Sequence, residues 1–260
     1  MNPIASSSAS SASRAPSFAR IAWLESRNEF LSKLRTPIFA LPTLLFPLVF
    51  YVMFAVLMNR GSPAAATYLL ATYGVFGVMG AAMFGFGVSV AMERTQGLLR
   101  LRKAMPMPPS TYLLAKLASA MVFALTISGM LLAIGVFVGH AQVDAMQALV
   151  LVGINLLGTL PFAAVGLYIG TRSGANGAPA IINLVFLPMA FLSGLWMPLS
   201  MLPAWIAKLA PVWPSYHLSQ LALKVVDRDA AQPAWLHVAV LLVVTVVFAT
   251  LARARLRAAE

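Results

Sequence analysis

The chain has 260 residues, of which 60% are hydrophobic and only 10% are charged. Because soluble domains carry about 25% charged residues, this composition excludes an ordinary soluble domain and indicates a membrane protein. Cysteine is absent, which excludes disulfides, a thiolate metal site and a cysteine nucleophile.

The N-terminal segment divides into a tail and a helix. Residues 1–16 are rich in Ser and Ala and are expected to be a disordered tail. No apolar run follows them directly, so a cleaved secretory signal is not expected. Residues 17–36 predict an amphipathic helix that lies along the inner membrane surface. Its apolar side would hold Ile21, Trp23, Leu24, Phe30, Leu31 and Leu34, and its polar side Glu25, Ser26, Glu29 and Lys33.

Residues 37–260 contain six apolar segments close to the ~20 residues that cross a bilayer. The fifth and sixth are the shortest. The glycines of the second segment predict close helix packing, with a subunit interface or a translocation wall as the alternative. The six predicted spans are Ile38–Met58, Tyr68–Val90, Leu113–Val138, Met146–Ile169, Ala178–Leu195 and Trp235–Ala252.

The basic residues predict the orientation, because cytoplasmic segments are enriched in Lys and Arg. With the N-terminus inside, the outer segments hold only Arg60, Lys208, Lys224 and Arg228. This asymmetry predicts that both termini are cytoplasmic, and it accounts for the net charge of +11 without nucleic acid as a partner. The inner segments hold Arg14, Arg20, Arg27, Lys33, Arg35, Arg94, Arg100, Arg102, Lys103, Lys116, Arg172, Arg253, Arg255 and Arg257.

The inner loop at residues 91–112, AMERTQGLLRLRKAMPMPPSTY, combines leucines with basic residues. Its three prolines would end any helix there. The pattern is compatible with a short amphipathic helix that projects into the cytosol, or with an inner loop that is only positively charged. The residues alone leave both open.

Chemistry-bearing residues are scarce. None of the seven Asp and Glu residues falls in a predicted span, which argues against a proton-driven transporter, although backbone carbonyls can still coordinate Na⁺. His140, His217 and His237 are far apart in the sequence and lack metal-ligand spacing. No phosphate-binding GxxxxGK[ST] loop is present. Active transport would therefore need an ATPase on another chain.

The stretch FLSGLWMPLSMLPAWIAKLAPVWPSYH, residues 191–217, is apolar but carries four prolines and three tryptophans. Proline breaks a spanning helix, and tryptophan favours the membrane surface. Within the predicted outer re-entrant loop, residues 196–233, two interpretations stay open for residues 196–217: an aromatic anchor at the outer surface, or a re-entrant hairpin that gates a path. The gate candidates are Gly194, Trp196, Pro198, Pro203, Trp205, Pro214 and Tyr216.

Three stretches together resemble the membrane subunits of ABC exporters of the bacterial type-2 permease family. They are the amphipathic helix running into LRTPIFALPTLLFPLVFYVMF, the loop MERTQGLLRLRKAMPMPPSTYLLAK, and FLSGLWMPLSMLPAWIAKLAPVWPSYHLSQLAL. The pattern G-L-W-x-P-x-x-x-L-P-x-W followed by P-x-Y-H is the most specific part. The resemblance covers nearly the whole chain after residue 17 and is closest to the drug-efflux branch.

The resemblance implies an all-α, six-span subunit that pairs with a second permease copy, as a homodimer, and with two cytosolic ATP-binding subunits. ATP and Mg would bind those subunits, so this chain would hold no cofactor, metal or catalytic residue. The helix at 17–36 would connect to the ATPase, and the loop at 91–112 would form a coupling helix. The family's E-x-x-x-G element matches at Glu93 and Gly97. The implied coupling residues are Glu25, Arg27, Glu29, Glu93, Gly97, Arg100 and Arg102.

The expected function is ATP-driven export of an amphipathic or hydrophobic solute, such as a drug, lipid or metabolite, across the bacterial cytoplasmic (inner) membrane. One alternative is a polysaccharide or glycolipid permease of the same family. The other is a membrane scaffold that transports nothing. A secondary transporter or an integral membrane enzyme is less favoured, because the predicted spans lack acids and the chain lacks a convergent His/Asp/Glu cluster.

Overall fold

The computed structural model describes residues 18–59, 62–98, 101 and 109–258, and all regular elements within these ranges are helices. The prediction of an all-α protein is thereby confirmed. The elements are α1 (Phe18–Leu34), α2 (Pro37–Tyr51), the π-helix η1 (Val52–Met58), α3 (Pro63–Thr95), α5 (Pro109–Phe137), α6 (Ala145–Arg172), α7 (Ala178–Leu192), the 3₁₀ turn η2 (Leu199–Met201), α8 (Ala204–Leu209), the 3₁₀ turn η3 (Ala210–Val212), α9 (Pro214–Val225) and α10 (Ala234–Ala258).

Five helical segments are long and apolar enough to cross a membrane, which supports a multi-pass membrane protein. They match five of the six predicted spans. The remaining predicted span, the fifth, corresponds to α7, which has only 15 residues, or about 22 Å of helix. The five long segments are Pro37–Met58 (α2 with η1), Pro63–Thr95, Thr111–Phe137, Ala145–Arg172 and Ala234–Leu256.

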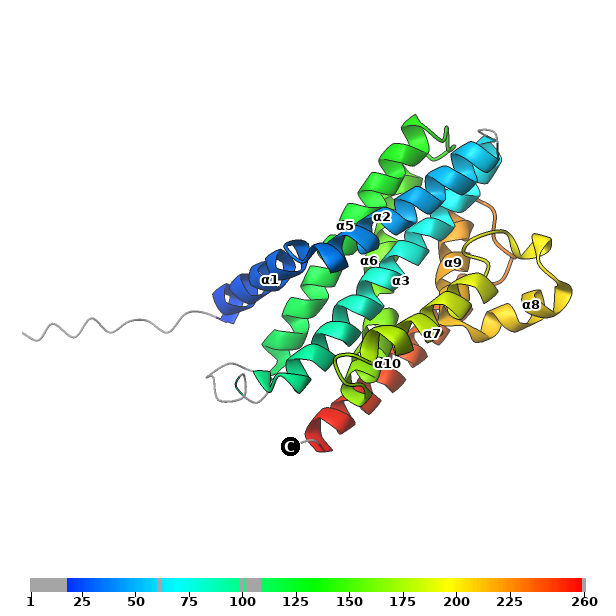
Figure 1. Cartoon of the computed structure of the whole chain (residues 1–260). Coiled ribbons are helices and arrows are strands. Elements are labelled where there is room, and N and C mark those ends of the chain that lie inside the picture. The colour runs from blue at the N-terminus through cyan, green and yellow to red at the C-terminus, as the bar shows by residue number, and fades with distance from the viewer. Residues whose placement is uncertain (1–17, 60–61, 99–100, 102–108, 259–260) are drawn as a thin grey trace, which may run out of the picture.

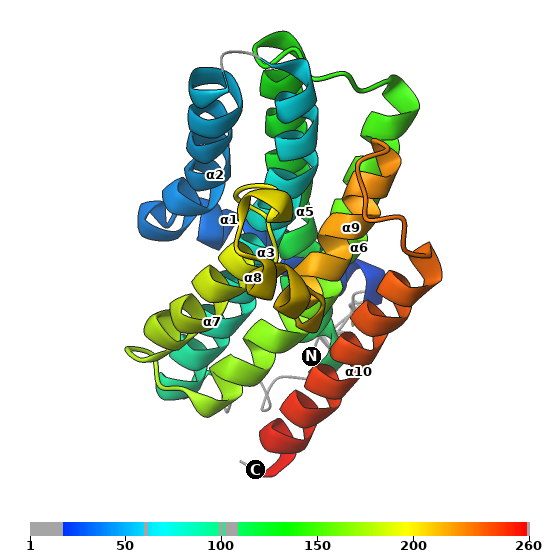
Figure 2. The same ribbon diagram turned by 90° about the vertical axis from the view of Figure 1, so that its right-hand side faces the viewer.

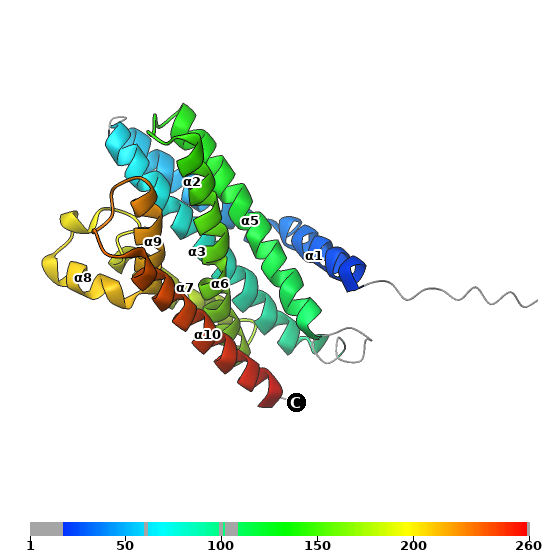
Figure 3. The same ribbon diagram turned by 180° about the vertical axis from the view of Figure 1, so that it is seen from behind.

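The central helix is α3, which is mostly buried and packs against α2, α5, α6, α7 and α9. Figures 1 and 3 show α3, α5 and α6 running along one another. Glycines allow α3 and α6 to touch backbone to backbone. A Cβ on Gly166 would lie 2.6 Å from the Met83 carbonyl oxygen, and one on Gly170 would lie 2.5 Å from that of Gly87. A larger residue at either position of α6 would push the two helices apart.

The predicted fifth span, Ala178–Leu195, is wrong at its C-terminal end, because α7 stops at Leu192. Gly194 adopts a φ of 78°, which is left-handed and ends the helix. A Cβ at Gly194 would also lie 2.7 Å from Leu199 Cγ. Ser193–Leu195 has no charge or proline to mark this turn, so the apolar pattern continues past the real end of the helix.

Helix α9 starts beside the end of α7 and packs along α6. The Ser215 hydroxyl donates to the Met189 carbonyl (3.1 Å) and to Ser193 Oγ (2.9 Å). Leu218 then packs on Gly158, halfway along α6, and Figure 2 shows α9 beside α6. At the other end of α9, the Val225 carbonyl accepts from Gln147 Nε2 (3.0 Å), in the first turn of α6. Thus α7 reaches the middle of α6, and α9 covers the remaining half.

The segment between α7 and α9 is held against α3. The Tyr68 hydroxyl donates to the Gly194 carbonyl (3.3 Å), and the Tyr73 hydroxyl donates to the Trp196 carbonyl (3.4 Å). Tyr73 lies ten residues after the start of α3, which corresponds to about 15 Å along the helix. The segment after α7 therefore packs beside the body of α3, and not only at its end.

One end of the bundle contains α1 and the C-terminal ends of α3 and α10 (Figure 1). The charge pattern predicts that this end is cytoplasmic, and it is called the inner end below. The extended backbone of Thr36 (φ −102°, ψ 91°) separates α1 from α2, as expected for a residue before proline. Helix α1 leaves the bundle at an angle and packs against α5.

Candidate functional site

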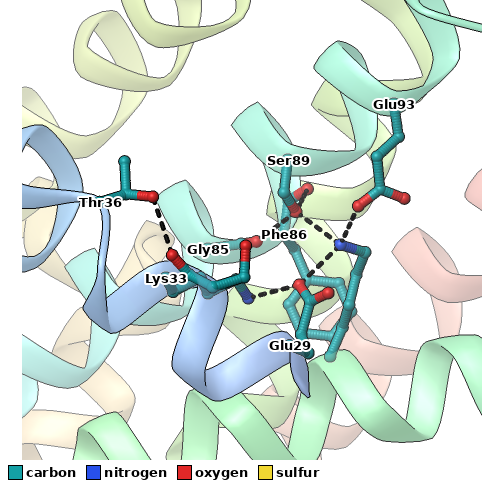
Figure 4. Close-up of polar contacts among 9 residues, drawn as sticks. Glu29, Lys33, Thr36, Gly85, Phe86, Ser89 and Glu93 are labelled. Carbon is teal, nitrogen blue, oxygen red and sulfur yellow. Dashed lines mark hydrogen bonds and ion pairs between the residues drawn. The ribbon is translucent and has the colours of Figure 1, made fainter. Parts of the chain in front are cut away.

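A fully buried lysine joins three helices at the inner end. Lys116 lies two turns into α5, and none of its surface is exposed. Its Nζ donates to Glu29 Oε1 on α1 (2.8 Å), to Glu93 Oε1 on α3 (2.7 Å) and to Ser89 Oγ (3.0 Å). Figure 4 shows Glu29, Ser89 and Glu93 converging from these helices. The three donated bonds use the full capacity of one ammonium group.

A second lysine completes the cluster. Lys33 is buried, and its Nζ lies 3.1 Å from Glu29 Oε1 as an ion pair without hydrogen-bond alignment. Burial lowers the pKa of Lys33 to about 8, partly opposed by Glu29. Burial would raise the pKa of Glu29, but Lys116 and Lys33 outweigh it and lower that pKa overall. We call Glu29, Lys33, Glu93 and Lys116 the inner charge cluster; its two cations balance its two carboxylates.

Such a cluster is costly to disturb. Buried ions lose their hydration, and removing one partner of a buried pair leaves an uncompensated charge that costs about 3–5 kcal/mol. Glu93 is particularly dependent on Lys116, because its Oε2 is buried and has no partner among the described residues. The cluster therefore ties the positions of α1, α3 and α5 to one another.

The residues that follow Glu93 on α3 form hydrogen bonds to the end of α6 and to the segment before α7. The Arg94 guanidinium donates to the carbonyls of Thr171 and Ser173, at the end of α6. These carbonyls lack helical partners, so a cation there is favourable. The Thr95 hydroxyl accepts from the backbone N–H of Ala175 (3.2 Å), just before α7. Residues 93–95 thus connect the last turn of α3 to α1, α5, α6 and the start of α7.

The expected coupling residues fall into three groups. Glu29 and Glu93 meet on Lys116, Glu25 is half-buried on the same helix as Glu29, and Arg27 is exposed. Gly97 has a φ of 73° and ends α3 in open space. Arg100 and Arg102 lie outside the described residues. Lys116 was assigned only a topological role from the sequence; its position within an otherwise apolar segment, Leu113–Val138, is the signal that could have identified it.

The polar side of α1 faces the protein. A helix that lies along the inner membrane surface would instead turn its charged side toward the cytosol. Glu29 and Lys33 point to α5 and α3. On the apolar side, Trp23 is 67% exposed, and Leu24 and Leu34 are also exposed. The predicted apolar side is thus divided: Trp23, Leu24 and Leu34 are exposed, whereas Phe30 packs against the core, with its ring centroid 5.4 Å from that of Phe123. The polar side turns inward because of the buried cation on α5, which a helical wheel of α1 alone cannot reveal.

The outer candidates separate into packed and exposed residues. Trp196 lies 5.8 Å from the Phe50 ring and 6.2 Å from the Phe76 ring, so it packs between α2 and α3. Trp205 on α8 is 59% exposed. Pro198 and Pro203 precede η2 and α8, and Pro214 begins α9. Tyr216, in the first turn of α9, is buried. Gly194 and Trp196 are the two candidates that bond to α3.

The histidines, expected to be far apart, are not all separate. His217 Nδ1 and His237 Nδ1 lie 2.9 Å apart, and both rings are buried. His140 lies on an exposed turn between α5 and α6. The sequence separation of 20 residues hides the contact, because α9 and α10 fold back on each other. Among the described residues, no group of three His, Cys, Asp or Glu side chains is placed to hold a metal ion.

Comparison with known proteins agrees with the membrane architecture. The family described as "ABC-2 family transporter protein" matches residues 59–254. The chain is also similar to the protein named "Putative transport permease YvfS" of Bacillus subtilis (strain 168), with 26% identity over 223 residues, which are 85% of this chain and 90% of that one. Members of this family are membrane transport subunits and not enzymes themselves. The chain therefore belongs to the ABC-2 family of transporter proteins.

Proposed function

We propose that the chain is the permease subunit of an ATP-driven exporter, and that a separate cytosolic ABC ATP-binding subunit powers it. The observation that carries the proposal is the convergence of α1, α3 and α5 on Lys116. Helix α1 and the end of α3 flank the surface expected to contact the ATPase. A displacement at that surface would reach the membrane helices through buried ion pairs.

The proposed transmission has two branches. Through Glu93 and Lys116, movement of the α3 terminus acts on α5 and α1; through Arg94 and Thr95 it acts on α6 and α7. ATP binding would favour one of two arrangements of these helices. A shift from 1:99 to 99:1 requires about 5.5 kcal/mol of differential binding, so the connecting contacts must resist breaking on that scale. Buried ion pairs, at about 3–5 kcal/mol per lost partner, are of this order.

In the proposed topology the chain crosses the membrane six times, with both termini in the cytoplasm. The crossings are α2 with η1, α3, α5, α6, α7 with α9, and α10. The fifth crossing is then discontinuous, and residues 193–213 form the re-entrant excursion between its halves. Irregular backbone at membrane depth is tolerated when it is packed on protein, and the bonds from Tyr68 and Tyr73 supply such packing.

The proposed solute is amphipathic or hydrophobic, and a second copy of the chain supplies the other wall of its path. The support is the apolar character of the long helices and the internal pairing of the inner charge cluster. A proton or ion pathway would need ionisable groups open to water at membrane depth. In the inner charge cluster Lys116 is fully enclosed and the two carboxylates are nearly enclosed. The cluster therefore suits a mechanical role better than a role in an ion pathway.

The proposal is tested by reconstituting the chain in liposomes with and without its ATP-binding subunit, which is identified by co-purification and mass spectrometry. Accumulation of a hydrophobic dye or labelled lipid is then measured with ATP. We expect transport only with both subunits. Equal transport by the chain alone would contradict the proposal, and stable binding without ATP-dependent transport of any solute class would favour the scaffold.

The coupling role has its own test in Glu93→Gln. This variant keeps the side-chain shape but removes the charge that Lys116 binds. We expect an assembled complex whose transport per ATP hydrolysed falls several-fold. Asp227→Asn is the matched control, because Asp227 is exposed in the turn after α9 and its φ of 54° suits asparagine. An unchanged ratio of transport to hydrolysis in Glu93→Gln would remove the carboxylate from the coupling account.

A further inference from the structure

The buried histidine pair between α9 and α10 has a hydrogen-bond pattern that fixes where each proton lies. His217 Nε2 is 2.8 Å from the Pro211 carbonyl, and this oxygen can only accept. With both rings neutral, His217 must therefore carry its proton on Nε2, and its Nδ1 is an acceptor. His237 must then donate its Nδ1–H across the 2.9 Å contact. This assignment leaves Nε2 of His237 as a bare lone pair.

That lone pair is the unusual feature of the site. His237 is 0% exposed, and its Nε2 has no hydrogen-bond partner among the described residues. The Tyr216 ring lies edge-on against both imidazoles, with centroid distances of 5.4 Å and 6.1 Å. A basic nitrogen is thus buried beside an aromatic ring, without a hydrogen-bond partner among the described residues. Nothing in this geometry gives an acceptor to the N–H that would form if His237 bound a proton.

The charged groups around the pair offer little compensation. Lys224 and Asp229 are the charged residues whose fields act on His237, and they neutralise each other through a 2.7 Å ion pair. Asp229 also acts on Tyr216. The helices packed on α9 are α3, α6 and α10. Their charged residues at the inner end are Glu93, Arg94, Arg172, Arg253 and Arg255, and Asp144, which caps the opposite end of α6, is bonded to Gln147. The η3 turn contributes only the Pro211 carbonyl.

We propose that His217 and His237 form a proton-binding site that holds α9 against α10 while both rings are neutral and releases it when His237 binds a proton at Nε2. An unpaired charge in an apolar site is strongly unfavourable, so protonation favours a separated, hydrated arrangement. In the separated arrangement the imidazole is hydrated, and a hydrated histidine takes up a proton near pH 6.5. By linkage, separation becomes more favourable as the pH falls through that value.

The release would act on the segment expected to form the outer gate. Ser215, two residues before His217, bonds to the end of α7, and Pro211 belongs to the turn that enters α9. Loosening α9 from α10 therefore loosens residues 193–213 at their C-terminal attachment. The site lies at the α10 end opposite Arg253 and Arg255, so acidity on the outer side would be the signal. The inference does not depend on the solute or on the ATPase.

The first test reads the protons directly. The chain has only three histidines, so ¹⁵N-histidine labelling gives few ring signals in magnetic-resonance spectra of the full chain in nanodiscs. At pH 8 we expect one ring protonated on Nδ1 and one on Nε2, with a coupling between the two facing Nδ1 atoms. The absence of any ring that is protonated on Nδ1 and coupled to the Nδ1 of a second ring would overturn the assignment.

The second test measures the separation. The chain contains no cysteine, so Val212→Cys and Val238→Cys, both at exposed positions, can carry a unique pair of spin labels. We expect one short distance at pH 8 and a growing longer population below about pH 6.5. A distance distribution that is the same at pH 8 and pH 5 would overturn the proposal.

Two variants link the movement to His237. In His237→Gln the amide can still donate to His217 Nδ1 but does not titrate, so we expect the longer population to fall at least fivefold at pH 5. His140→Asn is the control, because this histidine is exposed and its φ of 52° suits asparagine; it should respond as the parent does. A parent-like response of His237→Gln would overturn the assignment of the proton site to His237.

Discussion

Replacing Lys116 with methionine isolates the contribution of the inner charge cluster to stability. Methionine is unbranched and similar in length to lysine, but it cannot bind the two carboxylates. Glu29 keeps Lys33 as a partner at 3.1 Å. Glu93 loses Lys116, the cation with which it forms an ion pair among the described residues. Lys116→Met therefore leaves one nearly enclosed carboxylate without a compensating charge.

The expected loss follows from that count of partners. One uncompensated buried charge costs about 3–5 kcal/mol, and a chain of this size loses about 2–4 °C of Tm per kcal/mol. The midpoint should therefore fall by about 6–20 °C. Adding Glu93→Gln removes the orphaned charge, so the double variant Lys116→Met/Glu93→Gln should recover at least about 1 kcal/mol. Lys208→Met, at an exposed position on α8, should stay within about 0.5 kcal/mol of the parent.

The assay is thermal unfolding of the purified chain in one detergent, followed by circular dichroism and by the fraction that remains monodisperse in gel filtration. The four proteins are compared at pH 7 and equal detergent concentration. A midpoint for Lys116→Met within 1–2 °C of the parent, or a double variant less stable than Lys116→Met, would refute the view that Lys116 compensates Glu93.

Three further outcomes are expected. Gly194→Ala should destabilise the chain by about 1–3 kcal/mol, because φ is 78° and the new Cβ meets Leu199; Gly129→Ala, with nothing within 4 Å of its Cβ, should not. Thermal stability should rise between about pH 8 and 10.5, because the folded chain holds Lys33 with a pKa of about 8 and binds fewer protons there than the unfolded chain; Lys33→Met should lack this rise, and an identical slope in both proteins would contradict the burial of Lys33. Trp196→Ala should cost about 3–5 kcal/mol by opening a cavity beside Phe50 and Phe76, whereas Trp205→Ala should leave the free energy of unfolding nearly unchanged, and the reverse order would show that the wrong tryptophan has been assigned to the core.

The membrane-length helices could be predicted from the sequence because span length and apolar composition are local properties. The fifth predicted span shows the limit of that signal. Its apolar run continues through Ser193 and Leu195, while the helix ends at Leu192 because Gly194 turns left-handed against Leu199. Hydropathy averaged over a window of residues does not detect a single dihedral angle. Nor could it show that α9, which is more polar than the long helices, would pack along α6.

The inner charge cluster was less accessible from the sequence, because it depends on contacts between residues that are distant in the chain. Glu29 and Glu93 could be identified individually, one from its helix and one from the E-x-x-x-G element. Lys116 is 87 residues from Glu29, and its sequence context suggested only a positive charge at an inner boundary. The histidine pair was missed for the same reason, since the contact exists only after α10 folds back on α9.

The glycine contacts between α3 and α6 determine which parts of the protein can bend. A single helix can bend when its neighbours allow it. Two helices in direct backbone contact resist bending more strongly, because neither can bend without moving the other. Met83, Gly87, Gly166 and Gly170 hold α3 and α6 in such contact over the inner half of the bundle. A push on residues 93–95 would then tilt both helices together and deliver its full displacement to the far ends of the pair.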